Sequence, residues 1–121
     1  MSAESFIDTN LFIYQLEALD ERKAAISEKI IREAVATGSA CVSFQVIQET
    51  LNVVLRKAEI PLDLDAARRY LETVLSPLFR VPATIDLYHR ALDVQARYRY
   101  SFYDSLIVAA ALIAGCKRLY S

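Results

Sequence analysis

The chain has 121 residues, of which 14 are Lys or Arg and 15 are Asp or Glu, giving a net charge of −1. This length fits one domain that can bury a core of its own, and the balanced charge excludes a global positive field that would attract nucleic acid, so any such contact must be local or use metal ions. The longest apolar run, residues 106–116, is too short to span a bilayer.

The first half of the chain alternates short apolar segments with longer amphipathic ones. Residues 4–8 ("ESFID") predict a first strand, and residues 40–44 ("ACVSF") predict a second. Thr9 or Asn10 is expected to cap the first helix, and Gly38 to end the second. The helices expected in this half cover residues 10–19, 20–37 and 44–58.

The second half continues the alternation. We expect short strands at residues 79–83 and 117–121, and Pro77 should end the first helix of this half. The helices expected here cover residues 62–76, 85–98 and 103–115, the last apolar on every face and ended by Gly115. Strands that alternate with helices pair in parallel through right-handed crossovers. The sequence therefore predicts a single three-layer α/β/α domain over residues 1–121, with a small parallel central sheet.

Two carboxylates stand at the ends or borders of these elements. Asp8 follows the first strand, and ligands of open α/β sheets bind at the carboxyl ends of strands. Its other interpretation is helix capping. Glu49 lies at the edge of the apolar arc of its helix, near uncharged polar side chains, which indicates a cleft; an ordinary boundary glutamate is the alternative. The polar neighbours are Gln45, Gln48 and Asn52.

A third carboxylate, Asp104, opens the wholly apolar helix. A buried charge is costly unless it is paired or metal-bound. The alternative is a capping box, because "SFYD" places Ser101 three residues before Asp104. Ser105, next to it, could cap the helix or hydrogen-bond a ligand or its water.

A compact α/β fold can bring Asp8, Glu49 and Asp104 to the same sheet edge. Carboxylates that cluster repel one another unless a cation neutralises them. Oxygen ligands without His or Cys suit Mg²⁺ or Mn²⁺, which can activate water against a phosphodiester. The sequence thus predicts a divalent metal site formed by these three side chains.

Three segments together resemble the PIN domain family, most closely its VapC-type toxins. They are "FIDTN", "QVIQETLNVVLRK" and "YSFYDSLIVAAALIAGCKRLYS". The resemblance implies a metal-dependent endoribonuclease whose acidic residues are Asp8, Glu49 and Asp104. Asp8 and Asp104 would hold Mg²⁺ directly, and Glu49 would ligate it or orient the attacking water. The supporting residues would be Thr9 or Asn10 near Asp8, and Ser105 near Asp104.

The same resemblance implies partners and one departure from the pattern. An RNA substrate, a small antitoxin whose tail covers the site and self-association as a homodimer are all expected. The family usually carries a further acidic residue just after the last strand, and no acidic residue follows "RLYS" here. We therefore expect a domain that lacks its extreme C-terminal segment and binds metal more weakly.

Arginines and aromatic rings alternate in "RYRYSFYD", residues 97–104. Arginines bind phosphates and rings stack on unpaired bases, so Arg97, Arg99 and Tyr100 are candidate RNA-binding residues. The alternative is a helix end whose rings pack on the core. His89, the one histidine, is expected to be a surface or packing residue.

Cys41 and Cys116 stand in apolar contexts without CxxC spacing, which indicates two small buried thiols rather than a zinc site or disulfide framework. The first apolar run is interrupted by polar residues, so no signal peptide is recognised and a cytoplasmic protein without a membrane partner is expected.

Two other functions compete with the nuclease. One is a catalytically impaired module of the same fold that acts by binding proteins, suggested by the missing acidic residue and the 55% hydrophobic content. The other is a phosphatase of the haloacid dehalogenase type, which also begins with a strand-terminal aspartate. That class needs a second aspartate two residues later, where this chain has Asn10.

Overall fold

The computed structural model describes residues 3–56 and 62–121. Its centre is a four-stranded sheet in the order β3-β2-β1-β4, and neighbouring strands pair in parallel, as the sequence predicts. Phe6 of β1 pairs with Cys41 on one side and with Leu119 on the other. The strands are β1 (Ser5–Ile7), β2 (Ala40–Ser43), β3 (Phe79–Val81) and β4 (Arg118–Tyr120).

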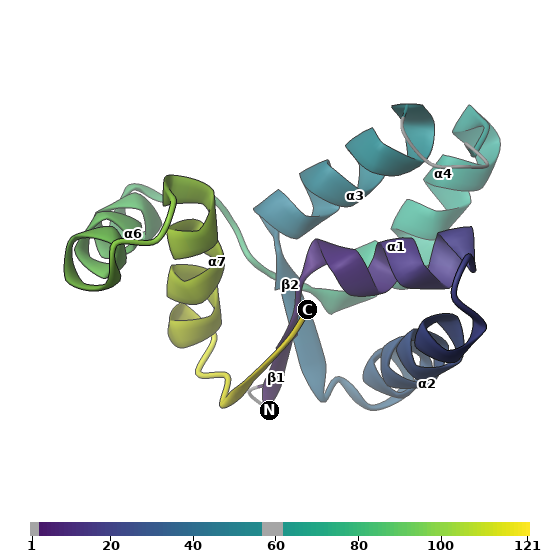
Figure 1. The fold of residues 1–121 in the computed structure, drawn as a ribbon, viewed down its shortest axis with the longest axis horizontal. Helices are drawn as coiled ribbons and strands as arrows, with labels where there is room; N and C mark the ends of the chain where they lie inside the picture. Colours follow the sequence, from purple (N-terminus) through teal and green to yellow (C-terminus); the bar gives the residue numbers. More distant parts are fainter. Residues whose placement is uncertain (1–2, 57–61) are drawn as a thin grey trace.

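Helices cover both faces of the sheet, which confirms the three-layer arrangement. In Figure 1, α6 and α7 lie on one side of the strands, and α1 and α2 lie on the other. Helix α6 packs on α7, and α1 packs on α2 and α3. The helices are α1 (Thr9–Glu17), α2 (Glu21–Thr37), α3 (Phe44–Arg56), α4 (Leu64–Tyr70), α5 (Ser76–Leu78), α6 (Ile85–Tyr98) and α7 (Phe102–Ile113). The predicted end of the third helix, residues 57 and 58, lies outside the described residues.

Two predicted boundaries were wrong around prolines. Pro77 does not end a helix: α4 passes through a π-helical segment, Leu71–Leu75, into α5, and Pro77 lies in the first turn of α5. Pro77 thus follows directly on the π-helical segment, and the helical backbone continues past it to Leu78. Strand β3 stops at Val81 rather than at residue 83, since Pro82 has no N–H to donate to a sheet.

The predicted start of the first helix was wrong, and the predicted end of the second was confirmed. Asp8, and neither Thr9 nor Asn10, caps α1: its backbone is extended and its Oδ1 accepts from the Thr9 N–H at 2.7 Å. Thr9 is already helical, so the cap position falls on the residue that ends the strand. Gly38 ends α2 as predicted, with a φ of 71° that favours glycine.

The core lies on both faces of the sheet, with β1 and β2 buried along their whole length. Cys41 belongs to this core, whereas Cys116 is only partly buried. The two free thiols meet, with their Sγ atoms 3.8 Å apart. Burial raises the pKa of Cys41 to about 12, so its thiol stays protonated and packs as a small apolar group. No helix in the described ranges is both long and apolar enough to cross a bilayer.

Candidate active site

Asp8 lies where the first strand ends and the first helix begins. Its N–H donates to the Tyr120 carbonyl of β4 at 2.8 Å, so the neighbouring strand fixes its backbone. Its carboxylate caps α1 through the Thr9 N–H. Asp8 is partly buried, and one carboxylate oxygen remains for a second partner. The capping interpretation is therefore correct, and capping leaves the side chain available for a further role.

Glu49 approaches the same sheet edge from α3. This helix starts at Phe44, directly after β2, which brings its second turn above the carboxyl ends of the strands. The Glu49 Oε1 accepts a hydrogen bond from the Thr9 hydroxyl at 3.1 Å. Thr9 thus joins the start of α1 to α3 and ties Glu49 to the residue next to Asp8.

Asp104 stands in the first turn of α7, where a carboxylate suits the positive end of the helix dipole. Ser101 caps this helix by accepting from the Asp104 N–H at 3.1 Å, as the capping-box pattern predicts. The Gln45 side chain donates from Nε2 to the Tyr103 carbonyl at 3.2 Å. Gln45 therefore fixes the start of α7 against α3, and with it the distance between two of the acidic residues.

Like charges act on one another across this edge. Burial raises the pKa of Asp8, and the negative charge of Asp104 raises it further, while the Thr9 hydrogen bonds oppose the shift. Burial is also the main cause that raises the pKa of Glu49, followed among the raising causes by the charges of Asp8 and Asp104. Hydrogen bonds from Thr9 and Gln45 oppose that shift. These charge interactions link the three carboxylates at this edge of the sheet. Asp8 is partly buried, whereas Glu49 and Asp104 are exposed, so the buried charge expected at Asp104 is wrong.

The donor set suits a hard divalent ion. Within the described residues no group of three or more His, Cys, Asp or Glu side chains is arranged to hold a metal ion. Mg²⁺, however, keeps several water ligands and is commonly bound through one or two carboxylates. Neighbouring carboxylates repel one another, and a bound cation removes this repulsion; at this edge the charges of Asp8 and Asp104 both act on Glu49.

The predicted supporting residues differ in their surroundings. Thr9 contacts Glu49 as described, whereas Asn10 is exposed. Ser105 is fully buried, and in the described part of the chain its Oγ has no hydrogen-bond partner. A buried hydroxyl without a protein partner is commonly satisfied by a buried water. The role of Ser105 toward a ligand stays a prediction.

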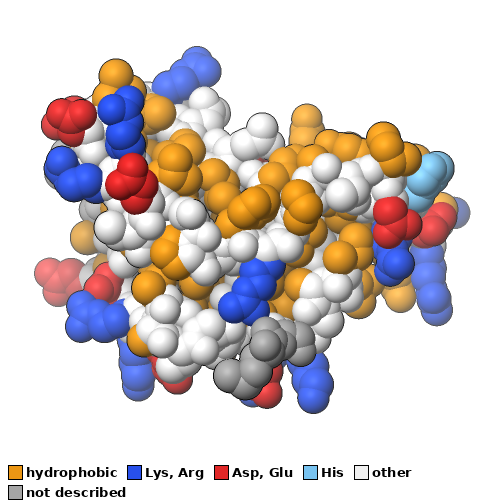
Figure 2. Space-filling model, turned by 180° about the vertical axis from the view of Figure 1, so that it is seen from behind, with side chains coloured by type: hydrophobic (Ala, Val, Ile, Leu, Met, Phe, Trp, Pro, Cys, Tyr) orange, Lys and Arg blue, Asp and Glu red, His pale blue; other side chains and the backbone are white. Residues whose placement is uncertain are grey.

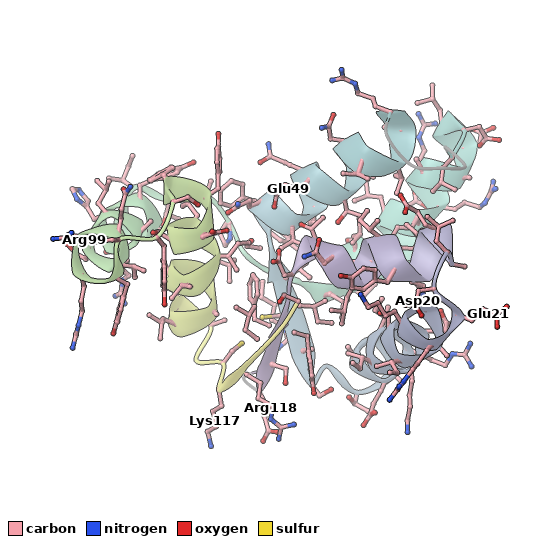
Figure 3. All side chains as sticks on the ribbon, viewed as in Figure 1. Asp20, Glu21, Glu49, Arg99, Lys117 and Arg118 are labelled. Carbon is pink, nitrogen blue, oxygen red and sulfur yellow. The ribbon has the colours of Figure 1, made fainter. Side chains whose placement is uncertain are left out.

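The predicted RNA-binding residues lie at the end of α6 and in the turn that leads to α7. Arg99 ends α6 with a φ of 58°, and in Figure 3 it lies at the outer side of α6, with α7 between it and Glu49. The Arg97 guanidinium lies 5.4 Å from the centre of the Tyr98 ring, and that ring stacks on Tyr100 at 5.6 Å. This view separates Arg99 from Glu49, and the RNA-binding role of Arg97, Arg99 and Tyr100 stays a prediction. His89 is exposed on α6.

A cleft of about 360 Å³ adjoins Glu49. The uncharged polar residues around Glu49 indicated such a cleft. Of its lining residues only Glu49 was a predicted site residue; the three amides were predicted as its neighbours, and Tyr103 was not predicted to lie beside it. The cleft is lined by Gln45, Gln48, Glu49, Asn52 and Tyr103.

Thr9→Val tests the link between Thr9 and the carboxylates. The Thr9 side chain lowers the pKa of both Asp8 and Glu49 by hydrogen bonding, so its loss should raise both values further. NMR titration of the side-chain carboxyl carbons in metal-free buffer measures the shift. Thr9→Ser keeps the hydroxyl and should leave both values near those of the wild type. An unchanged Glu49 value in Thr9→Val would contradict the assigned hydrogen bond.

Comparison with known proteins identifies the family and the fold. The sequence model of the PIN domain family matches residues 5–121. The crystal structure of VapC20 from Mycobacterium tuberculosis, described as a toxin that cleaves the sarcin-ricin loop, has a TM-score of 0.69 and 24% identity, covering 97% of this chain and 88% of that chain.

A toxin–antitoxin complex from Klebsiella pneumoniae is also similar, with a TM-score of 0.61 and 17% identity, covering 94% of this chain and 82% of that chain. Likeness at these identities shows a shared fold. No curated protein matches this chain significantly in sequence.

Proposed function

The chain belongs to the PIN domain family, and we propose that it is a metal-dependent endoribonuclease that hydrolyses RNA phosphodiester bonds. One observation carries the proposal: three carboxylates at the carboxyl edge of the parallel sheet are near enough for their charges to interact. They come from the residue after β1, from α3 and from α7. Asp8, Glu49 and Asp104 form this set. The fold shared with an RNA-cleaving toxin supports the same reaction.

Each carboxylate has a role in this proposal. Asp8 and Asp104 would hold Mg²⁺ or Mn²⁺, and Glu49 would be a further ligand or would orient the attacking water. Such an ion, when bound, makes a bound water more acidic and stabilises the charge that develops on the phosphate. Glu49 is suited to accept a proton because its raised pKa makes it a stronger base than an ordinary glutamate. Thr9 and Gln45 keep its side chain in place.

The proposal extends to biological partners. A solved toxin–antitoxin complex shares this fold, which supports a small antitoxin as the protein partner of this chain. We propose that the chain is the toxin of such a pair, that it acts in the cytoplasm and that it forms a homodimer. The tail of the antitoxin would cover the carboxylates and place a cationic group against them.

Cleavage of RNA in the presence of a divalent ion tests the reaction. Purified protein is expected to cut single-stranded or structured RNA with Mg²⁺ or Mn²⁺, to stop in EDTA and to resume when the ion is restored. Gel analysis of end-labelled RNA detects internal cuts. An RNA that remains intact with either ion, in a preparation whose fold is verified by circular dichroism, would contradict the assignment.

A catalytically impaired binding module is the second candidate. It is favoured by the absence, in the described ranges, of a ready three-ligand metal group. Hydrophobic side chains are also exposed on α6 and α7, including Ile85 at 73% and Leu112 at 62%, and Figure 2 shows such side chains gathered on one face. Calorimetry separates the two candidates: a stable complex with an antitoxin but no heat of Mn²⁺ binding would favour the module.

A further inference from the structure

The cleft beside Glu49 has a lining of unusual chemistry. Three carboxamides, one carboxylate and one tyrosine line it, and neither Lys nor Arg is among the described residues that do so. Such a lining offers hydrogen-bond donors and acceptors but no positive charge for a phosphate. A neutral, planar group with mixed donors and acceptors fits this chemistry, and a nucleobase is such a group.

The amides face the cleft from one side of α3. Gln48 and Asn52 are four residues apart, so they project from the same face of the helix, and both are exposed. Gln45, one turn earlier, is buried, and its Nε2 donates to the Tyr103 carbonyl. This bond ties α3 to the start of α7, so the two walls of the cleft are held at a fixed separation.

Tyr103 supplies a flat surface at the opposite wall. It is 67% exposed, yet its ring has fixed neighbours. Phe102 meets it edge-on at 5.9 Å, and Phe102 stacks on Tyr88 with ring centres 6.5 Å apart. Tyr88 in turn contacts Phe44 at 6.5 Å, next to β2. A row of rings thus runs from the core to the cleft and supports an exposed ring on which a base can stack.

We propose that this cleft binds one unpaired nucleobase of the RNA substrate, stacked on Tyr103 and hydrogen-bonded at its edge by Gln48 and Asn52. This inference rests on the proposed function, because Glu49 belongs both to the cleft and to the carboxylate set. A base held here sets which phosphodiester bond reaches Asp8 and Asp104. The cleft therefore determines the position of the cut through the identity of one base.

RNA binding tests the proposal independently of cleavage. All variants are made in an Asp8→Asn background, and their affinity for fluorescein-labelled single-stranded RNA decamers is measured by fluorescence anisotropy. Tyr103→Ala is expected to weaken binding by about 5- to 150-fold, the range that base stacking on an aromatic side chain contributes. Tyr103→Phe keeps the ring and should bind nearly as well as the parent.

Tyr14→Ala is the matched control, since Tyr14 lies on α1 and lines a different cleft. It should leave the affinity unchanged. Gln48→Ala combined with Asn52→Ala should reduce the differences among decamers of A, C, G and U, because these amides read the edge of the base.

A double-mutant cycle with the RNA identifies the contact itself. Decamers that lack one base at successive positions are bound by the parent and by Tyr103→Ala. At one position, the loss of binding free energy from removing the base and the loss from removing the ring should not add, since both changes remove the same stacking contact. Losses that add at every position, or an affinity unchanged by Tyr103→Ala, would overturn the cleft proposal.

The two proposals fail in different ways. If the wild type cleaves RNA and Tyr103→Ala binds RNA as well as its parent, the base-binding proposal is wrong and the nuclease proposal stands. If RNA binding depends on Tyr103 but the wild type does not cleave RNA, the base-binding proposal stands and the nuclease proposal is wrong.

Discussion

Asp8→Asn is expected to reduce metal-dependent RNA cleavage by about 100-fold or more while leaving the fold intact. The substitution removes the negative charge that a divalent ion needs and keeps the shape of the side chain. Asparagine caps helices about as well as aspartate, so the start of α1 should survive. Initial rates on an end-labelled RNA, at saturating Mn²⁺, measure the loss, and circular dichroism verifies the fold.

Asp20→Asn is the matched control for this experiment. Asp20 caps α2 by accepting from the Lys23 N–H at 3.1 Å, so the same change is made at the same kind of position. In Figure 3 it lies at the opposite end of α1 from Glu49. Its cleavage rate should stay within about twofold of the wild type, since surface changes away from a site have small effects. Equal rates for Asp8→Asn and the wild type would show that Asp8 holds no catalytic ion.

The position of the carboxylates could be predicted because each is tied to an element boundary. Asp8 follows a buried strand, and Asp104 opens an apolar helix, so a parallel sheet places both at one edge. Glu49 could be placed near them because its helix starts directly after the neighbouring strand. The amides around Glu49 indicated a cleft for a similar reason. Uncharged polar side chains at the border of a core need hydrogen-bond partners, and water in a cleft provides them.

The contacts between distant parts of the chain could not be predicted. Gln45 and Tyr103 are 58 residues apart, and the two thiols that meet are 75 residues apart. Such pairs depend on the exact packing of α7 and the last turn against the sheet, and no local pattern encodes them. The direction of the loop after α6 is another example. Its turn depends on Arg99, whose left-handed backbone ends α6, and nothing in "RYRY" indicates a positive φ at an arginine.

A stability measurement across pH, with and without metal, tests the electrostatics of the site. Asp8 and Glu49 have folded-state pKa values above their ordinary values, so the folded chain binds protons more tightly than the unfolded chain. Their contribution to stability is therefore complete below the ordinary values, near 4, and is lost as the pH rises through the raised values. Metal-free protein should lose stability over this window, and Asp8→Asn should lose less.

A divalent ion should reverse this loss at neutral pH. Mn²⁺ at about 100 times its dissociation constant is expected to stabilise the wild type by about 2.7 kcal/mol, because it binds only the folded carboxylates. The gain should vanish near pH 4, where protons occupy the same oxygens, and in Asp8→Asn at every pH. Asp20→Asn should keep the full gain. Thermal unfolding followed by circular dichroism provides these values, and a gain that is equal at pH 4 and pH 7 would place the ion somewhere other than on these carboxylates.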